Sequence, residues 1–145
     1  MYHAPDPETQ PEFYAGVPAK RLLAWLVDTV VIALLSALVV LLTVGIGAFF
    51  WPLLYLAVGF CYRWITIAAN SATWGMSFAG IELRDAQGAR LDTGYAFAHT
   101  LGYSLSIATF VIQAVSVFMM LTTARGQGLT DAFLGTVMIN RRAAR

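Results

Sequence analysis

Residues 22–44 read LLAWLVDTVVIALLSALVVLLTV, an apolar run in which Asp28 is the only charged residue. The run is longer than the roughly 20 residues that an α-helix needs to cross about 30 Å of hydrocarbon. It therefore predicts a transmembrane helix.

Two further apolar stretches follow, at residues 46–69 and 95–123, and both are long enough to span a bilayer. Only the short segment 45–47, which begins and ends with glycine, separates the first two, so we expect them to form a tight antiparallel hairpin. The predicted fold is an all-α membrane protein with about three transmembrane helices.

The polar stretch 70–94 separates the second and third helices. Residues 80–84 alternate in polarity and residues 85–88 have turn chemistry, which predicts a short β-hairpin or a hooked loop at the membrane surface. Residues 1–18 are rich in proline and acidic residues and are expected to form a disordered cytoplasmic tail. A membrane domain at 19–140 and a basic tail at 141–145 complete the predicted layout.

The composition supports a protein of the lipid bilayer. Of 145 residues, 59% are hydrophobic and 12% charged, whereas soluble domains have about 25% charged residues. The net charge of +1 argues against a nucleic-acid partner. Two histidines and one cysteine cannot build a zinc site, and no catalytic constellation or nucleotide loop is present. We expect neither enzymatic activity nor a metal or cofactor.

The basic residues predict the side of the N-terminus but not the side of the C-terminus. Lys20 and Arg21 precede the first helix, which favours a cytoplasmic N-terminus. Three full crossings would place four basic residues on each side of the membrane, whereas a third stretch that dips in and returns would bring the C-terminus back. The side of the C-terminus stays open at this point.

Asp28 lies inside the first helix, where an ionised carboxylate costs about 2.5–3.5 kcal/mol. In a hairpin that turns at 45–47, Arg63 lies at the same depth, which predicts a buried Asp28–Arg63 ion pair. Such a pair is either a structural lock or a titratable functional site.

The third apolar stretch carries small and polar residues at steps of three and four. On one continuous helix they would form a single stripe, either a packing seam or a polar path. The stripe consists of His99, Gly102, Ser106, Thr109, Gln113 and Ser116.

Three motifs resemble those of the RDD family of small bacterial integral membrane proteins. RLLAWLVD at 21–28 resembles the opening motif, TWGM at 73–76 with GIELRD at 80–85 the central loop, and GLTDAFLGTV at 128–137 the closing motif. Arg21, Asp28 and Asp131 would be the residues that name the family. Many members have a lysine where this chain has Met76, and an arginine near His99.

The resemblance implies a multi-pass protein of the bacterial inner membrane with a transport-related role. Asp28 and Asp131 would bind a cation or proton, with Arg21 or Arg63 as the competing charge. Three helices cannot easily enclose a pathway, so we expect a homo-oligomer or a larger membrane-protein partner. The alternative is a non-transporting accessory or scaffold subunit in which the same residues are structural.

Overall fold

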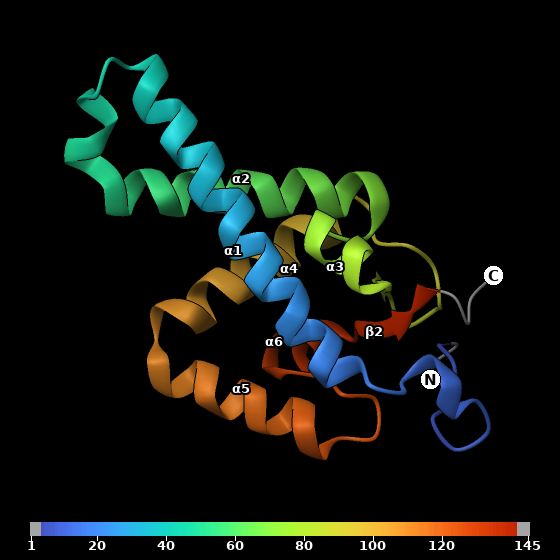
Figure 1. Ribbon diagram of the computed structural model, residues 1–145. Coiled ribbons are helices and arrows are strands. Elements are labelled where there is room, and N and C mark those ends of the chain that lie inside the picture. Colours follow the sequence, from blue (N-terminus) through green and yellow to red (C-terminus); the bar gives the residue numbers. More distant parts are fainter. Residues whose placement is uncertain (1–3, 142–145) are drawn as a thin grey trace.

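The computed structural model describes residues 4–141 and is mostly helical, with a two-stranded antiparallel sheet (Figure 1). In chain order the elements are η1 (Pro11–Phe13), α1 (Val17–Leu42), η2 (Ile46–Phe50), α2 (Trp51–Asn70), α3 (Trp74–Ala79), β1 (Ile81–Arg84), α4 (Thr93–Ala108), α5 (Phe110–Thr122), α6 (Leu129–Leu134) and β2 (Val137–Asn140).

Two helices are long and apolar enough to cross a membrane: α1, and α2 together with η2. Their large apolar side chains stay exposed, as with Leu34 at 66% and Leu41 at 75%. A continuous exposed apolar surface of this kind is stable only where lipid covers it. The two helices leave the turn at 43–50, and α1 crosses over α2 (Figure 1), with a hydrogen bond from the Tyr62 hydroxyl to Asp28 (2.7 Å) between them.

The expected third helix at 95–123 is broken in two. The chain leaves α4 at Thr109, which has extended dihedrals (φ −115°, ψ 101°), and the axis of α5 is bent by 117° from that of α4. If α4 and α5 together form one span, the protein has three spans. If they form a re-entrant loop instead, the protein has two. The predicted single polar stripe is therefore wrong, because His99 and Ser106 lie on α4 whereas Gln113 and Ser116 lie on α5.

The second half of the chain repeats the order of the first, although the sequence shows no repeat. Each half has two longer helices, a six-residue helix and a four-residue strand. Both short helices end at a glycine with positive φ, Gly80 at 80° and Gly135 at 74°, where other residues are strained.

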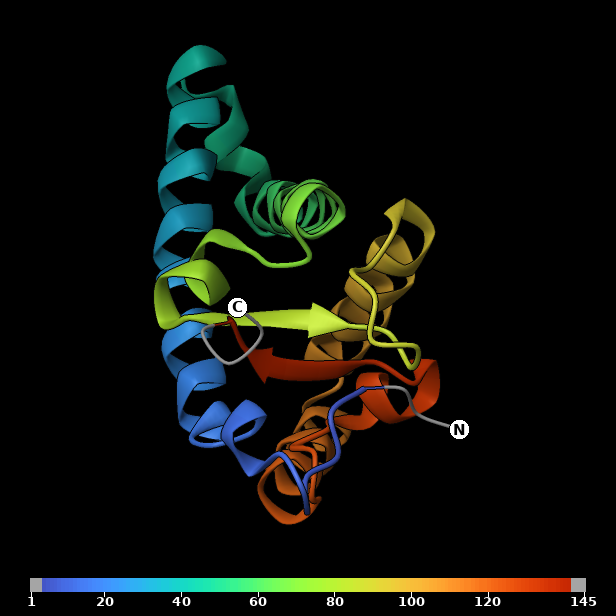
Figure 2. The same cartoon turned by 90° about the vertical axis from the view of Figure 1, so that its right-hand side faces the viewer.

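The strands of the two halves pair with each other. Ile81 faces Asn140 and Arg84 faces Val137, in antiparallel register, and Figure 2 shows the strands side by side near the start of α1. The local hairpin expected within 70–94 is wrong, since β1 takes its partner from the C-terminal segment. Residues 85–89 form only a turn, closed by a hydrogen bond from the Asp85 N–H to the Ala89 carbonyl (2.9 Å).

The buried core lies at one end of the molecule, where α1 begins and α2 ends. It gathers apolar side chains from α1, α2, α3, α4 and both strands. Its most buried members include Val17, Ile67, Ile81, Leu83 and Met138. We call this end, formed by α3, α6, β1, β2 and residues 4–16, the cap.

Within the tail that is expected to be disordered over 1–18, residues 4–16 pack against β2 as part of the cap, and residues 1–3 lie outside the described residues. Ala4 and Tyr14 form a cluster with Val137 and Ile139 of β2. The Asn140 amide also donates to the Glu12 carbonyl (2.8 Å) and the Ala15 carbonyl (2.9 Å). Packing against a strand far along the chain orders this segment. Of the expected basic tail at 141–145, only Arg141 lies within the described residues.

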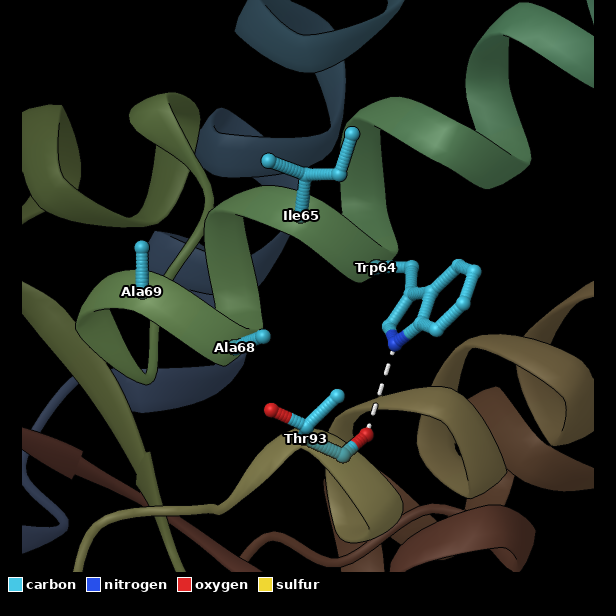
Figure 3. Close-up of a pocket in the computed structure, with 5 residues that line it drawn as sticks. All are labelled: Trp64, Ile65, Ala68, Ala69 and Thr93. Carbon is cyan, nitrogen blue, oxygen red and sulfur yellow. Dashed lines mark hydrogen bonds between the residues drawn. The ribbon is translucent and has the colours of Figure 1, made fainter.

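Helices α2 and α4 meet through aromatic rings. Phe97 contacts Phe60 and Trp64 edge-on, with ring centroids 5.5 and 5.1 Å apart. The Trp64 indole N–H donates to the Thr93 carbonyl (3.4 Å), beside an open hollow of about 400 Å³ (Figure 3). Trp64, Ile65, Ala68, Ala69 and Thr93 line this hollow, so its wall is almost wholly apolar.

The pairing of distant strands can be tested with cysteines at Leu83 and Met138, which are directly opposed. In a Cys61→Ser background, we expect Leu83→Cys with Met138→Cys to lose both free thiols on mild oxidation, measured by maleimide mass tagging. Leu83→Cys with Phe133→Cys is the control, because Phe133 is 90% exposed. Free thiols in the first pair would mean that the strands do not pair as described.

Candidate functional site

Asp28 sits on α1 and is only 1% exposed. Its carboxylate accepts hydrogen bonds from the Tyr62 hydroxyl (2.7 Å), the Thr73 hydroxyl (2.6 Å) and the Gly75 N–H (2.9 Å). The last two belong to the N-terminus of α3, where free N–H groups and the helix dipole favour a negative charge. Asp28 thus docks the short helix α3 onto the first span.

Met76, where the resemblance leads us to expect a lysine in many members, completes the N-terminus of α3. Its N–H donates to the Thr73 hydroxyl (3.1 Å), and its sulfur lies 3.5 Å from the Thr73 nitrogen. Met76 is buried in the cap core. The missing lysine is therefore replaced by an apolar side chain that packs, and Asp28 has no lysine partner at this position.

Arg63 lies near Asp28, as the hairpin geometry predicts, with 3.7 Å between Arg63 Nη1 and Asp28 Oδ2. This ion pair is longer than the three neutral hydrogen bonds to the same carboxylate. Arg63 divides its contacts, since it also stacks on the Tyr103 ring (4.1 Å to the centroid) and donates to the Tyr103 hydroxyl (3.3 Å). The Trp25 indole N–H donates to the same hydroxyl (2.8 Å), which links α1, α2 and α4.

Asp131, on α6, is also 1% exposed and forms a second site. Arg21 Nη1 lies 2.7 Å from one carboxylate oxygen, which also accepts from the Gly128 N–H (3.2 Å). The other oxygen accepts from the Thr136 hydroxyl (2.9 Å) and lies 3.0 Å from His99 Nε2. This contact ties the closing segment of the chain to the start of α1.

Asp131 stays ionised near neutral pH. Burial raises its pKa, but the Arg21 charge and the His99 hydrogen bond together lower the pKa well below its usual range. The stability that this charge contributes is present above the ordinary carboxyl pKa of about 3.9 and is lost only as the pH falls further. An ionised carboxylate only accepts, so His99 Nε2 carries the proton in this contact.

The two carboxylates have separate partners. Arg21 pairs with Asp131, whereas Arg63 approaches Asp28, although Arg21 and Asp28 lie two turns apart on the same helix. The trio of Arg21, Asp28 and Asp131 therefore forms two neighbouring locks along α1. Each lock fixes one of the short helices, α3 or α6, that precede the strands.

The polar residues expected on the third helix have different roles. His99 and Ser106 are buried on α4, and the Ser116 hydroxyl on α5 accepts the Leu129 N–H at the start of α6 (2.9 Å). Thr109 is exposed at the break, and Gln113 is half-buried. Only His99 joins a carboxylate site.

Hydrogen bonds from the chain surround both carboxylates and leave little room for a ligand. Each carboxylate has at least three hydrogen-bonding contacts with the chain itself. Among residues 4–141, no group of three or more His, Cys, Asp or Glu side chains could hold a metal ion. The apolar hollow beside Trp64 offers almost no polar groups to a solute.

The sequence patterns did not reveal most of the hydrogen-bond donors to these carboxylates. They identified Asp28, Arg63, Arg21, Asp131 and His99 as candidates. They missed the donors Tyr62, Thr73, Gly75 and Thr136. The motif Thr73-x-Gly75 was the available signal, because a hydroxyl followed by a glycine suits a helix start that receives an anion.

A substitution at Gly75 tests the Asp28 lock. A Cβ at Gly75 would lie 2.2 Å from the Ala24 carbonyl oxygen and 2.6 Å from Asp28 Oδ1, so α3 could not dock. We expect Gly75→Ala to destabilise the protein by about 1–3 kcal/mol, measured by unfolding in mixed micelles. Gly94→Ala is the control, since its Cβ would meet nothing closer than 3.5 Å. Equal stability of the two variants would contradict the close docking of α3.

A double-mutant cycle tests the Asp131 lock. Asp131→Leu leaves the Arg21 charge largely buried without its carboxylate, which we expect to cost about 3–5 kcal/mol. Arg21→Met with Asp131→Leu should lose less than the two single changes added together, by about 1–3 kcal/mol. Unfolding titrations at pH 7 measure all four proteins. Strict additivity would show that the two side chains do not interact.

The comparison with known proteins agrees with the three motifs. The model of the RDD family matches residues 15–135, which is most of the chain and includes Arg21, Asp28 and Asp131. No curated protein and no solved structure matches the chain. The protein belongs to the RDD family and is a small membrane protein.

Proposed function

We propose that this protein is a non-catalytic accessory or scaffold subunit that assembles within the membrane with a larger membrane protein or with its own copies. The observation that carries the proposal is that hydrogen-bond donors of the chain already occupy both carboxylates. Asp28 and Asp131 are fully buried, and donors of the chain itself occupy their oxygens. A carboxylate that exchanges a cation or proton needs an exposed oxygen or a partner that leaves easily.

The exposed surface supports an assembling role. Much of α1 and α2 presents large apolar side chains that only lipid or another helix can cover. The hollow beside Trp64, between α2 and the start of α4, is open and apolar and does not suit an ion path. The cap, in contrast, is a packed polar and apolar unit suited to present a fixed surface at the membrane boundary.

A transport role, by cation/proton exchange, is the second candidate, and the broken helix favours it. Many transporters place their sites where a membrane helix is interrupted and exposes unpaired backbone groups. The break at Thr109 between α4 and α5 is such an interruption, with Ser106 buried one turn before it. On this alternative, oligomerisation would complete the path.

We further propose that the cap faces the cytoplasm of a bacterial cell, with the molecule in the inner membrane. The contact between Arg21 and Asp131 supports a C-terminal segment on the same side as the start of α1. The basic residues of both ends and of the loop 85–92 then share one side, as the positive-inside bias favours. Three full crossings would divide them equally.

Reconstitution of the purified protein separates the two candidate functions. With wild-type protein in vesicles, we expect no proton flux in response to Na⁺ or K⁺ gradients, measured with an internal pH dye. Asp28→Asn should lower stability without changing that baseline, and Asp92→Asn serves as the control, because Asp92 is exposed and asparagine caps a helix start equally well. Saturable flux in wild type that disappears in folded Asp28→Asn would instead establish transport and contradict the accessory role.

A further inference from the structure

A third buried carboxylate, Glu82, organises an arginine cluster on the strand pair of the cap. Glu82 is 1% exposed in β1, and three guanidinium groups surround it. Arg84 Nε lies 3.2 Å from Glu82 Oε1, while Arg141 Nε and Arg90 Nη2 lie 3.4 and 3.9 Å from Oε2. Three positive charges around one negative charge leave the cluster basic.

Two of the three arginines keep donors for an outside anion. Arg84 is fully engaged, because it also donates to the Gly88 carbonyl (3.1 Å). Arg90 has 60% of its side chain exposed, and Arg141 uses only Nε toward Glu82. Within residues 4–141, the Nη nitrogens of Arg141 have no hydrogen-bond acceptor. Glu82 thus holds Arg90 and Arg141 close together with donors to spare.

The strand pair lies level with the ends of both spans. Lys20, in the first turn of α1, donates from Nζ to Asn140 Oδ1 of β2 (2.6 Å). Ser71, which caps the end of α2, donates to the Leu83 carbonyl of β1 (2.6 Å) and accepts the Leu83 N–H at its own carbonyl (2.8 Å). A sheet bonded to the membrane-boundary ends of two spanning helices lies in the headgroup layer.

Exposed aromatic side chains mark the same level. Trp74 and Phe78 on α3, directly before β1, are 55% and 73% exposed although they are large and apolar. Such rings are enriched at the membrane–water interface, where they anchor a protein at a fixed depth. They place the arginine cluster beside lipid phosphates.

We propose that Arg90 and Arg141 bind the phosphate of an anionic phospholipid, held in position by Glu82 and Arg84. Guanidinium groups match phosphate oxygens in two-point hydrogen bonds, and each basic residue at an anionic membrane surface adds to the attraction. This binding site is independent of the proposed accessory role, because it depends only on the cap and its depth in the membrane.

Native mass spectrometry of the full chain in mild detergent tests the site, with phosphatidylglycerol compared with phosphatidylcholine of equal chain length. We expect wild type to prefer phosphatidylglycerol. Arg90→Gln and Arg141→Gln should each weaken its binding about fivefold, whereas Arg90→Lys should weaken it less, because lysine keeps the charge but not the two-point hydrogen bond. Arg125→Gln, which removes the same charge from the loop before α6, is the matched control and should bind as wild type does.

Each outcome decides the proposal. Equal binding of the two lipids, wild-type preference in Arg90→Gln, or the same loss in Arg125→Gln would overturn it. Displacement of phosphatidylglycerol by millimolar inorganic phosphate would show a site for soluble phosphate and would overturn the lipid assignment. Because Arg90 is exposed and its loss should leave folding intact, Arg90→Gln decides the matter even if Arg141→Gln fails to fold.

Discussion

The ion pair between Arg21 and Asp131 joins the start of the first span to the closing segment of the chain, and the cap depends on it. A buried carboxylate without donors would be too costly to keep, so Asp131 brings Arg21, His99, Gly128 and Thr136 together. Helix α6 then packs beside α4 and α5, with the Arg21 side chain reaching it from α1, and β2 follows it into register with β1. Without this contact, β1 would be left as a lone strand with both edges unpaired.

Asp28 fixes the other short helix, α3, in a similar way. It accepts the Gly75 N–H in the first turn of α3, and α3 leads through Gly80 into β1. The two halves of the chain thus use the same device: a membrane helix bears a polar side chain that fixes a short helix, and the short helix delivers a strand. In the first half the carboxylate sits on the long helix; in the second it sits on the short one, facing His99.

This arrangement separates two environments. The cap holds the buried core, because water lies on its outer side and apolar burial stabilises it there. The spans have few buried side chains of their own and present their apolar surface to lipid. Both carboxylates are already hydrogen-bonded to donors of the chain, which supports the proposed scaffold role over that of an ion carrier.

Four features can be predicted from the sequence alone: that this is a membrane protein, its first two apolar helices, the turn between them, and the approach of Arg63 to Asp28. These depend on local composition and on spacing across a short turn, which periodicity and equal depth reveal. The sequence also contained the family motifs, each a short local pattern. The break at Thr109 could not be predicted from the sequence, because neither proline nor glycine marks the position.

The contacts between distant segments follow only from the folded structure. The pairing of β1 with β2, the order of residues 4–16, the hydrogen bonds around Asp28 and Asp131, and the arginine cluster on Glu82 all join residues far apart in the chain. Four-residue strands carry too weak a pattern to specify a partner. Their pairing follows from where two buried carboxylates anchor the helices that precede them, and a chain read in order does not show that.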